Sequence, residues 1–227
     1  MRCLTFAPLL GILFSLCSCS SVSVRPPYHT ASFAPPAKVP ARIYVQNFSS
    51  PDGVFRVDRS GNALKTVETD IEDKLSEGLA ERLTKSIAPT EILAENGKIP
   101  QGDAWLIAGK FDRVNQGSRA LRALVGLGAG GTKIETTVEV YNLAGKQPRK
   151  FLSFQTTGGS NAQQGLLTYP DPLGGPLAAI GQAAGTGLTI DTKRTSRMIT
   201  GLLCEYLRYR GVKLEHPVGF KPLGGIN

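Results

Sequence analysis

The residues best suited to chemistry in this sequence are two thiols near its start, in the stretch Leu16-Cys17-Ser18-Cys19. They follow one basic residue, Arg2, and an apolar run that ends at Leu16. This run is too short to span a bilayer, because a membrane helix needs ~20 apolar residues. A basic start, a short apolar centre and a small residue before the cut are typical of a secretory signal peptide. Ser18 is small enough for that position before Cys19, whereas Leu16 is too bulky for it before Cys17.

The stretch resembles the lipobox of bacterial lipoproteins, and the resemblance implies that Cys19 is lipidated. In that class the cysteine becomes the first mature residue and carries a diacylglycerol and an N-linked acyl chain such as palmitate. Three chains would hold the protein on a bilayer, since each buried methylene contributes ~0.8 kcal/mol. Ser20, in place of an aspartate, resembles the pattern of Gram-negative lipoproteins sent to the outer membrane. A secreted protein cut nearby and a short uncleaved anchor remain as alternatives.

Removal of residues 1–18 as the signal peptide leaves a basic chain long enough for one domain. The formal net charge of +8 loses only the charge of Arg2. A basic protein favours anionic neighbours such as lipopolysaccharide, phospholipid headgroups or acidic proteins. An exported, lipid-anchored chain meets little nucleic acid, so we expect none as a partner. A merely solvated basic surface is the simpler alternative.

The remaining reactive side chains do not form a catalytic or metal-binding pattern. Cys204 would be the one thiol left in the mature chain, and its apolar helical surroundings predict a buried hydrophobe. His29 and His216 lie in a predicted tether and a predicted tail, outside any scaffold. We therefore expect no catalytic residue, no metal and no cofactor. The carboxylates of Glu68, Asp70, Glu72 and Asp73 on a predicted helix, and those of Glu135 and Glu139 on one strand face, are most simply solvated surface groups. Two carboxylates can hydrolyse glycosides, however, so a hydrolase stays as an alternative.

Hydrophobic periodicity predicts an α+β domain over residues 41–213. The predicted strands are 43–48, 91–94, 104–114, 134–140 and 149–157, and the predicted long helices are 64–88 and 191–210. We expect an antiparallel-rich sheet of four or five strands with both helices packed mainly on one face. Residues 19–40 are rich in serine and proline and predict a lipid-anchored tether with a reach of roughly 65 Å. Residues 214–227 predict a flexible tail.

Two further patterns concern the second helix and the segment before it. Asp191 is expected to be the N-cap of that helix, and Gly211 to end it. Residues 158–190 lose periodicity and hold many glycines, so they predict a long surface loop, with a brief helix over 176–184 as an alternative. Arg194 and Arg197 lie on the second helix and are candidate interaction residues.

A glycine-rich segment separates two predicted strands. Gly126, Gly128 and Gly131 satisfy the dinucleotide pattern G-x-G-x-x-G. That pattern needs a following helix whose N-terminus faces the pyrophosphate, and here a strand follows, so we expect no nucleotide. Glycines between strands allow positive φ angles and close backbone approach. They indicate either a bent inter-strand connection or a contact surface flanked by Arg119 and Arg122.

The segment also carries a family resemblance. Arg119 and Arg122, Gly126-Leu127-Gly128-Ala129-Gly130, the alternating strand and the Asn142–Gly145 turn resemble a family of bacterial lipoproteins catalogued as domain of unknown function 4410. The resemblance covers residues 42–210, with Asn142 standing where an aspartate is more usual. It implies an envelope location and an α+β fold, and it supplies no substrate and no catalytic residues.

Together these patterns lead us to expect a non-enzymatic outer-membrane lipoprotein whose domain faces the periplasm. Its partners would be the membrane, through Cys19, and an envelope protein or an anionic envelope surface. The candidate interaction residues are Arg119, Arg122, Gly126, Gly128, Gly130, Arg194 and Arg197. The alternatives are a carboxylate-dependent cell-envelope hydrolase and an amphiphile-binding carrier, which would need an apolar cavity.

Overall fold

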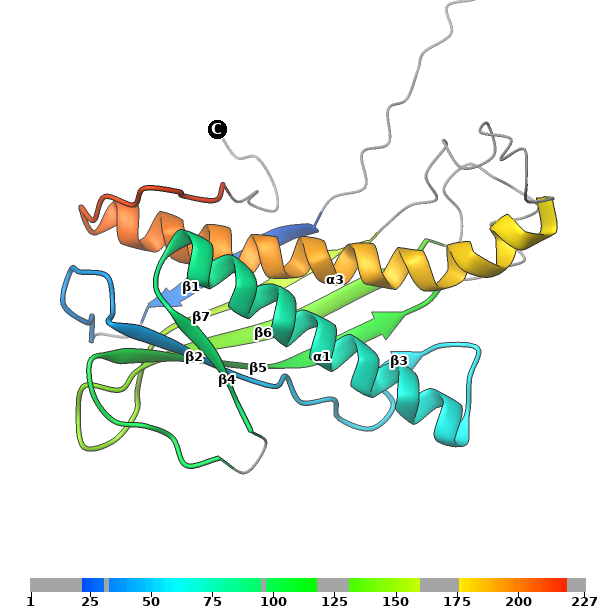
Figure 1. Ribbon diagram of the computed structural model, residues 1–227, viewed down its shortest axis with the longest axis horizontal. Helices are drawn as coiled ribbons and strands as arrows, with labels where there is room; N and C mark the ends of the chain where they lie inside the picture. Colours follow the sequence, from blue (N-terminus) through cyan, green and yellow to red (C-terminus); the bar gives the residue numbers. More distant parts are fainter. Residues whose placement is uncertain (1–21, 31–32, 95–96, 118–130, 160–175, 220–227) are drawn as a thin grey trace, which may run out of the picture.

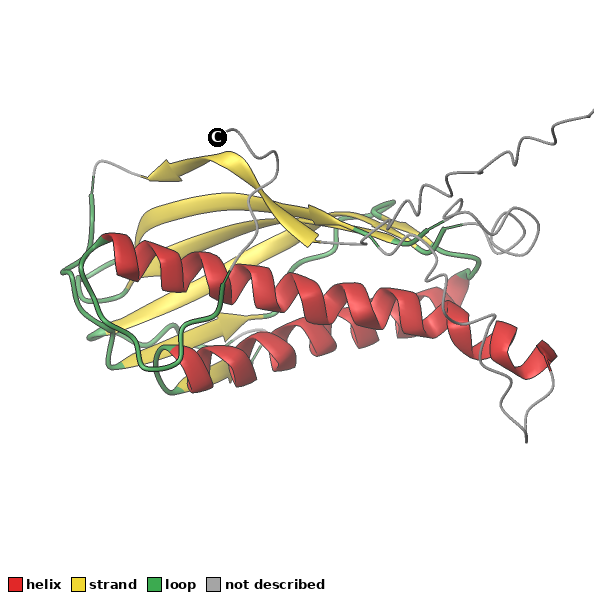
Figure 2. Cartoon of the chain, turned by 90° about the horizontal axis from the view of Figure 1, so that it is seen from above, coloured by secondary structure: helices red, strands yellow, loops and turns green. Residues whose placement is uncertain are grey.

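Two long helices lie across a mixed β-sheet in the computed structural model, which describes residues 22–30, 33–94, 97–117, 131–159 and 176–219 (Figure 1). The strands are β1 (Val22–Thr30), β2 (Arg42–Gln46), β3 (Phe55–Arg56), β4 (Thr90–Leu93), β5 (Ala104–Asn115), β6 (Lys133–Asn142) and β7 (Arg149–Gly158). The helices of these ranges are α1 (Gly61–Ser86) and α3 (Pro176–Tyr209). Seen from above, both helices lie on the same side of the sheet (Figure 2), as expected.

The sheet has an antiparallel half and a parallel half. Its order is β1-β7-β6-β5-β2-β4, and β3 pairs with β5 off this path. The neighbours β1, β7, β6 and β5 pair antiparallel, whereas β2 pairs parallel with both β5 and β4, and β3 parallel with β5. The α+β class is confirmed. The expected four or five strands are too few, because the seven-stranded sheet also includes β1 and β3 and joins β2 by parallel pairing.

The hairpin of β6 and β7 follows directly from its sequence. Ile134, Thr136, Val138 and Val140 alternate with polar residues, and each is completely buried under the helices. At the turn, Asn142 Oδ1 accepts a hydrogen bond from the Ala144 N–H at 3.3 Å. The two predicted strands, 134–140 and 149–157, are confirmed, and they pair antiparallel as a hairpin along most of their length.

Helix α1 buries the stripe that its four-residue repeat predicts. Ile71, Leu75, Leu79 and Leu83 face the sheet and are at most 3% exposed. The helix begins at Gly61, whose φ of 57° lies in the left-handed region that glycine tolerates. These bounds agree with the predicted helix to within three residues at each end.

Helix α3 is longer than predicted and begins at Pro176. Proline is favoured in the first turn of a helix, and the alanines that follow are strong helix formers. Asp191 is therefore not an N-cap: it lies inside the helix and is fully buried. The prediction of a long loop over 158–190 is wrong from Pro176 onward, and residues 160–175 lie outside the described residues.

The N-terminal segment also differs from the prediction. Val22–Thr30 forms β1, an edge strand paired with β7, so this part of the predicted tether is held in the sheet. Val24 is completely buried and belongs to the main core together with Phe154. Pro26 and Pro27 are compatible with this edge position, because an edge strand leaves part of its backbone unpaired.

Candidate functional site

Four strands meet the glycine-rich parts of the chain at one end of the sheet, which we call the glycine end. The strand registers place Asn115 opposite Lys133, and Gly158 opposite both Ile134 and Val22. The segment that carries Arg119 and Arg122 leaves the sheet after β5 and returns before β6. Both of its attachment points therefore lie at the same end of the sheet as the first residue of β1, with β7 between β1 and β6.

The backbones of two glycine-rich connections touch at this end. A Cβ atom on Gly159 would lie 2.0 Å from the carbonyl oxygen of Thr132, closer than real side chains approach. The Thr132 hydroxyl donates a hydrogen bond of 2.6 Å to Asp191 Oδ2 in α3. Both residues are buried, at 3% and 0% exposure. The return point of the glycine-rich segment is thus fixed to β7 on one side and to α3 on the other.

The sequence-based site residues fall into two groups. Cys19, Arg119, Arg122, Gly126, Gly128 and Gly130 lie outside the described residues. Arg194 and Arg197 lie on α3, but their surroundings differ. Arg194 is half-buried, 3.6 Å from Asp191 Oδ1, whereas Arg197 is exposed. Of these two, Arg197 is the one available to a partner.

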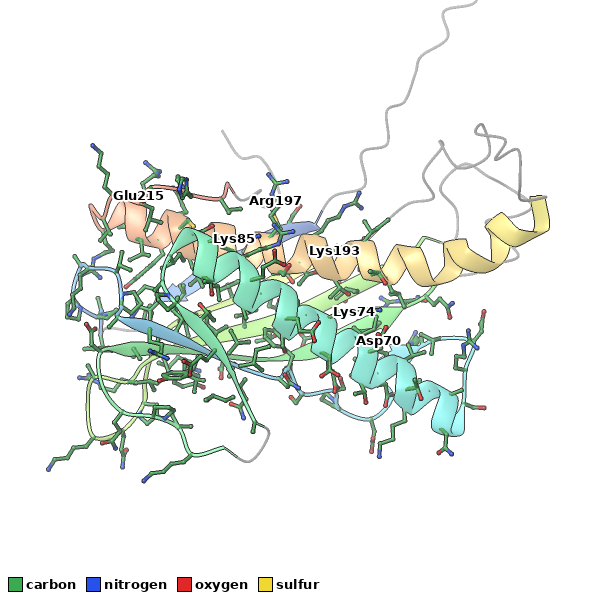
Figure 3. All side chains as sticks on the ribbon, viewed as in Figure 1. Asp70, Lys74, Lys85, Lys193, Arg197 and Glu215 are labelled. Carbon is green, nitrogen blue, oxygen red and sulfur yellow. The ribbon has the colours of Figure 1, made fainter. Side chains whose placement is uncertain are left out.

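Arg197 belongs to a cationic patch of residues from both helices, which the sequence did not predict to lie together. We use this name for Arg82 and Lys85 of α1 with Lys193 and Arg197 of α3. The Arg82 Nε–H donates to Ser196 Oγ at 3.2 Å, and the Ser196 hydroxyl donates to the Lys193 carbonyl at 2.9 Å. Figure 3 shows Lys85, Lys193 and Arg197 where the two helices run side by side.

No local sequence signal predicts the patch, because two small residues from distant parts of the chain bring the helices together there. A Cβ atom on Gly78 would meet Ser196 Oγ at 3.3 Å, so α1 and α3 approach closely at this point.

The cations of the patch act on the carboxyl group of Glu81 in α1. The hydrogen bond from Lys85 to Glu81, at 2.6 Å, and the charge of Lys85 hold the pKa of the Glu81 carboxyl below its usual value. Arg82 and Lys193 lower the pKa further, so the field of both helices reaches Glu81.

Glu135 and Glu139 lie on the sheet face that the helices leave open, and neither is arranged as a catalytic acid. Hydrogen bonds from Lys150 at 2.7 Å and Tyr141 at 2.5 Å lower the pKa of Glu139. Burial would raise the pKa of Glu135, but Lys133 and Thr157 outweigh it and lower the value. A general acid needs a raised pKa, whereas both carboxyls are held ionised.

Burial and the neighbouring Glu139 carboxylate also raise the pKa of Tyr141 to about 12. The phenol therefore keeps its proton at neutral pH and acts as a hydrogen-bond donor.

Cys204 is 2% exposed, which confirms its predicted burial, and burial raises the pKa of its thiol. A buried thiol with a raised pKa is a poor nucleophile.

Among the described residues there is no cluster of three or more side chains that could ligate a metal ion. In the same part of the chain, no helix combines the length and apolar character needed to cross a membrane.

Comparisons with known proteins place the chain in a family. No curated protein matches it. The solved structures similar to it include the PelC dodecamer from Paraburkholderia phytofirmans, with a TM-score of 0.40, and a dodecamer of a single-residue variant of that protein, with a TM-score of 0.37. Each is 12% identical and covers 77% of this chain and 95% of its own. The model of one family matches residues 43–159, and the chain therefore belongs to the family described as Domain of unknown function (DUF4410).

Proposed function

We propose that this chain is an outer-membrane lipoprotein without catalytic activity, which binds an envelope partner at its glycine end. One observation carries the proposal: Val22, three residues after Cys19, is held in β1 opposite Gly158. An extended chain spans at most ~3.6 Å per residue, so the lipidated cysteine would lie within ~11 Å of the sheet. The glycine end would then stay close to the membrane surface.

The same end also supports the choice of a binding role. Gly117 and Gly131 flank one glycine-rich segment, and Gly159 begins the next. Small residues let a partner's backbone approach closely, and the two segments leave the sheet side by side because Gly159 touches Thr132. A partner in the outer membrane or the adjoining periplasm would therefore meet both segments at once. Glu135 and Glu139, two of the carboxylates considered for a hydrolase, have lowered pKa values, which favours the binding role over hydrolysis at that face.

Photocrosslinking in cells tests this role. A photoreactive amino acid replaces Lys133 at the glycine end or, in the matched control, Lys98 in the loop before β5. Both are surface lysines, and Lys98 lies at the opposite end of β5. We expect a discrete protein adduct from position 133 and none from position 98. The adduct should disappear when Cys19→Ala removes the anchor.

Two outcomes would contradict the proposal. Equal adducts from both positions would show that the glycine end is not the contact surface. Turnover of a cell-wall substrate by the purified chain would show that it is an enzyme.

A further inference from the structure

We propose that the cationic patch docks on the anionic headgroups of the membrane that carries the anchor, and so fixes the orientation of the domain. The proposal rests on the proposed lipid anchor at Cys19. A lipid anchor limits the distance between the domain and the membrane, but a single attachment point does not by itself fix the rotation of the domain. A second, electrostatic contact would remove that freedom.

The patch has more positive charge than its surroundings neutralise. Lys85 pairs with Glu81 at 2.6 Å, and Glu205, further along α3, is bonded to Arg208. Within the described part of the chain, Arg82, Lys193 and Arg197 form no ion pair, although Arg82 is bonded to Ser196. Three cations on one surface repel each other, and an external anion relieves that repulsion.

The helices hold these cations in place. Arg82 is half-buried, and its bond to Ser196 fixes the guanidinium Nε at the contact of α1 with α3. Lys193 and Arg197 are exposed on α3 on either side of Ser196. Arginine binds phosphate through paired N–H donors, and lysine binds it as a point charge. Lipid headgroups that carry a phosphate can therefore bind both the arginine and the lysine side chains of the patch.

The position of the patch near the start of β1, three residues after the proposed anchor, favours a lipid surface over a soluble partner. The start of β1, dark blue in Figure 1, lies beside the middle of α3 in both ribbon views (Figures 1 and 2). Lys193 and Arg197 belong to this middle part of α3, and α3 packs directly against β1. The ~11 Å reach from Val22 to Cys19 is comparable to the Debye length of ~8 Å at physiological salt, so the headgroup charge is felt there.

The affinity of the domain for the membrane would come from its attachment to the lipid anchor as well as from the charge of the patch. An anchored domain presents its patch to the bilayer at a high effective concentration, so weak individual contacts suffice. Each basic residue near an anionic membrane strengthens binding about fivefold, and two together about thirty-fold. The non-acylated chain should therefore bind such a membrane weakly but measurably.

Vesicle co-sedimentation tests the patch apart from the anchor. The probe is the chain that begins at Ser20, which keeps every described residue, with vesicles of equal parts phosphatidylcholine and phosphatidylglycerol. We expect Lys193→Gln with Arg197→Gln to weaken binding about thirty-fold. The matched control, Lys98→Gln with Lys146→Gln, removes the same charge from exposed sites elsewhere and should weaken binding much less. Vesicles of phosphatidylcholine alone should bind none of these chains.

Four results would overturn the proposal. In the first two, the patch variant binds the anionic vesicles as tightly as the wild-type chain does, or the control variant loses as much affinity as the patch variant. In the other two, the wild-type chain binds the neutral vesicles, or it captures an acidic protein but binds no vesicles. Thermal unfolding checks that both double variants remain folded, as expected for exposed substitutions. Failure here leaves the adduct from position 133 unaffected, so the two proposals fail separately.

Discussion

Replacing Phe111 by alanine is expected to lower the free energy of unfolding by ~4 kcal/mol, a large part of the stability of a domain of this size. Phe111 is completely buried in β5. Its ring lies 6.1 Å from that of Phe48 and 5.9 Å from that of Phe55, so it connects the ends of β2 and β3 to the sheet. The removed ring would leave a cavity among groups that the sheet holds in place. Urea unfolding measures the change.

The control for this substitution is Phe33→Ala. Phe33 is half-buried, and the Arg149 guanidinium carbon lies 3.8 Å above its ring. Its loss should cost only ~1 kcal/mol, because solvent already reaches the ring and the cation–π contact is weak at such sites. Equal losses from both variants would contradict the position of Phe111 at the centre of the core.

Replacing Asp191 by alanine is expected to cost ~3 kcal/mol, which is typical for the removal of one member of a buried charged pair. The Thr132 hydroxyl would lose its acceptor, and Arg194 would lose the carboxylate 3.6 Å away. Because this bond connects α3 to the return point of the glycine-rich segment, the damage should be concentrated at the glycine end. Hydrogen exchange of the β6 and α3 amides would localise it.

Asp191→Asn separates the hydrogen bond from the charge. The amide oxygen can still accept from Thr132, so we expect a loss of only ~1 kcal/mol. A variant with alanine at position 191 that is as stable as wild type would show that the Thr132 contact contributes nothing. Faster exchange confined to β4, at the far edge of the sheet, would contradict the proposed location.

Local patterns predicted those helices and strands whose hydrophobic periodicity alone identifies the side that is buried. The four-residue repeat of α1 and the alternation of β6 are of this kind, and both lie where predicted. The pairing of β2 with β4 and β5 was not predictable, because parallel neighbours come together only through the α1 crossover. Their side chains carry no local sign of that pairing.

Two predictions were wrong for the same physical reason: the tether over the residues of β1 and the loop over the first part of α3. Val22–Thr30 contains two adjacent prolines, which disfavour a strand, and residues 176–190 contain three glycines, which weaken the helix preference of their alanines. Tertiary contacts outweigh these preferences: β7 supplies the hydrogen bonds of β1, and α3 buries Leu188 against the core. Asp191 was misread because an aspartate before an apolar stripe is also the pattern of an N-cap.

The candidate site was only half visible in the sequence. Arg197 is exposed as its helical position suggested, whereas Arg194 is occupied by Asp191. Arg82 joins the patch from a helix more than a hundred residues away, a distance that no local pattern crosses. The neighbourhood of Val22 and the glycine-rich connections was likewise hidden, because it depends on the register of β1 with β7.

The most direct test of the central claim is acylation at Cys19, three residues before the sheet. Cells grown with an alkyne-bearing fatty acid would be examined for labelling of the full-length chain, with Cys17→Ala as the neighbouring-thiol control. We expect Cys17→Ala to keep the label and to stay in the outer-membrane fraction, and Cys19→Ala to lose both. Labelling of Cys19→Ala as strong as that of wild type would contradict this expectation.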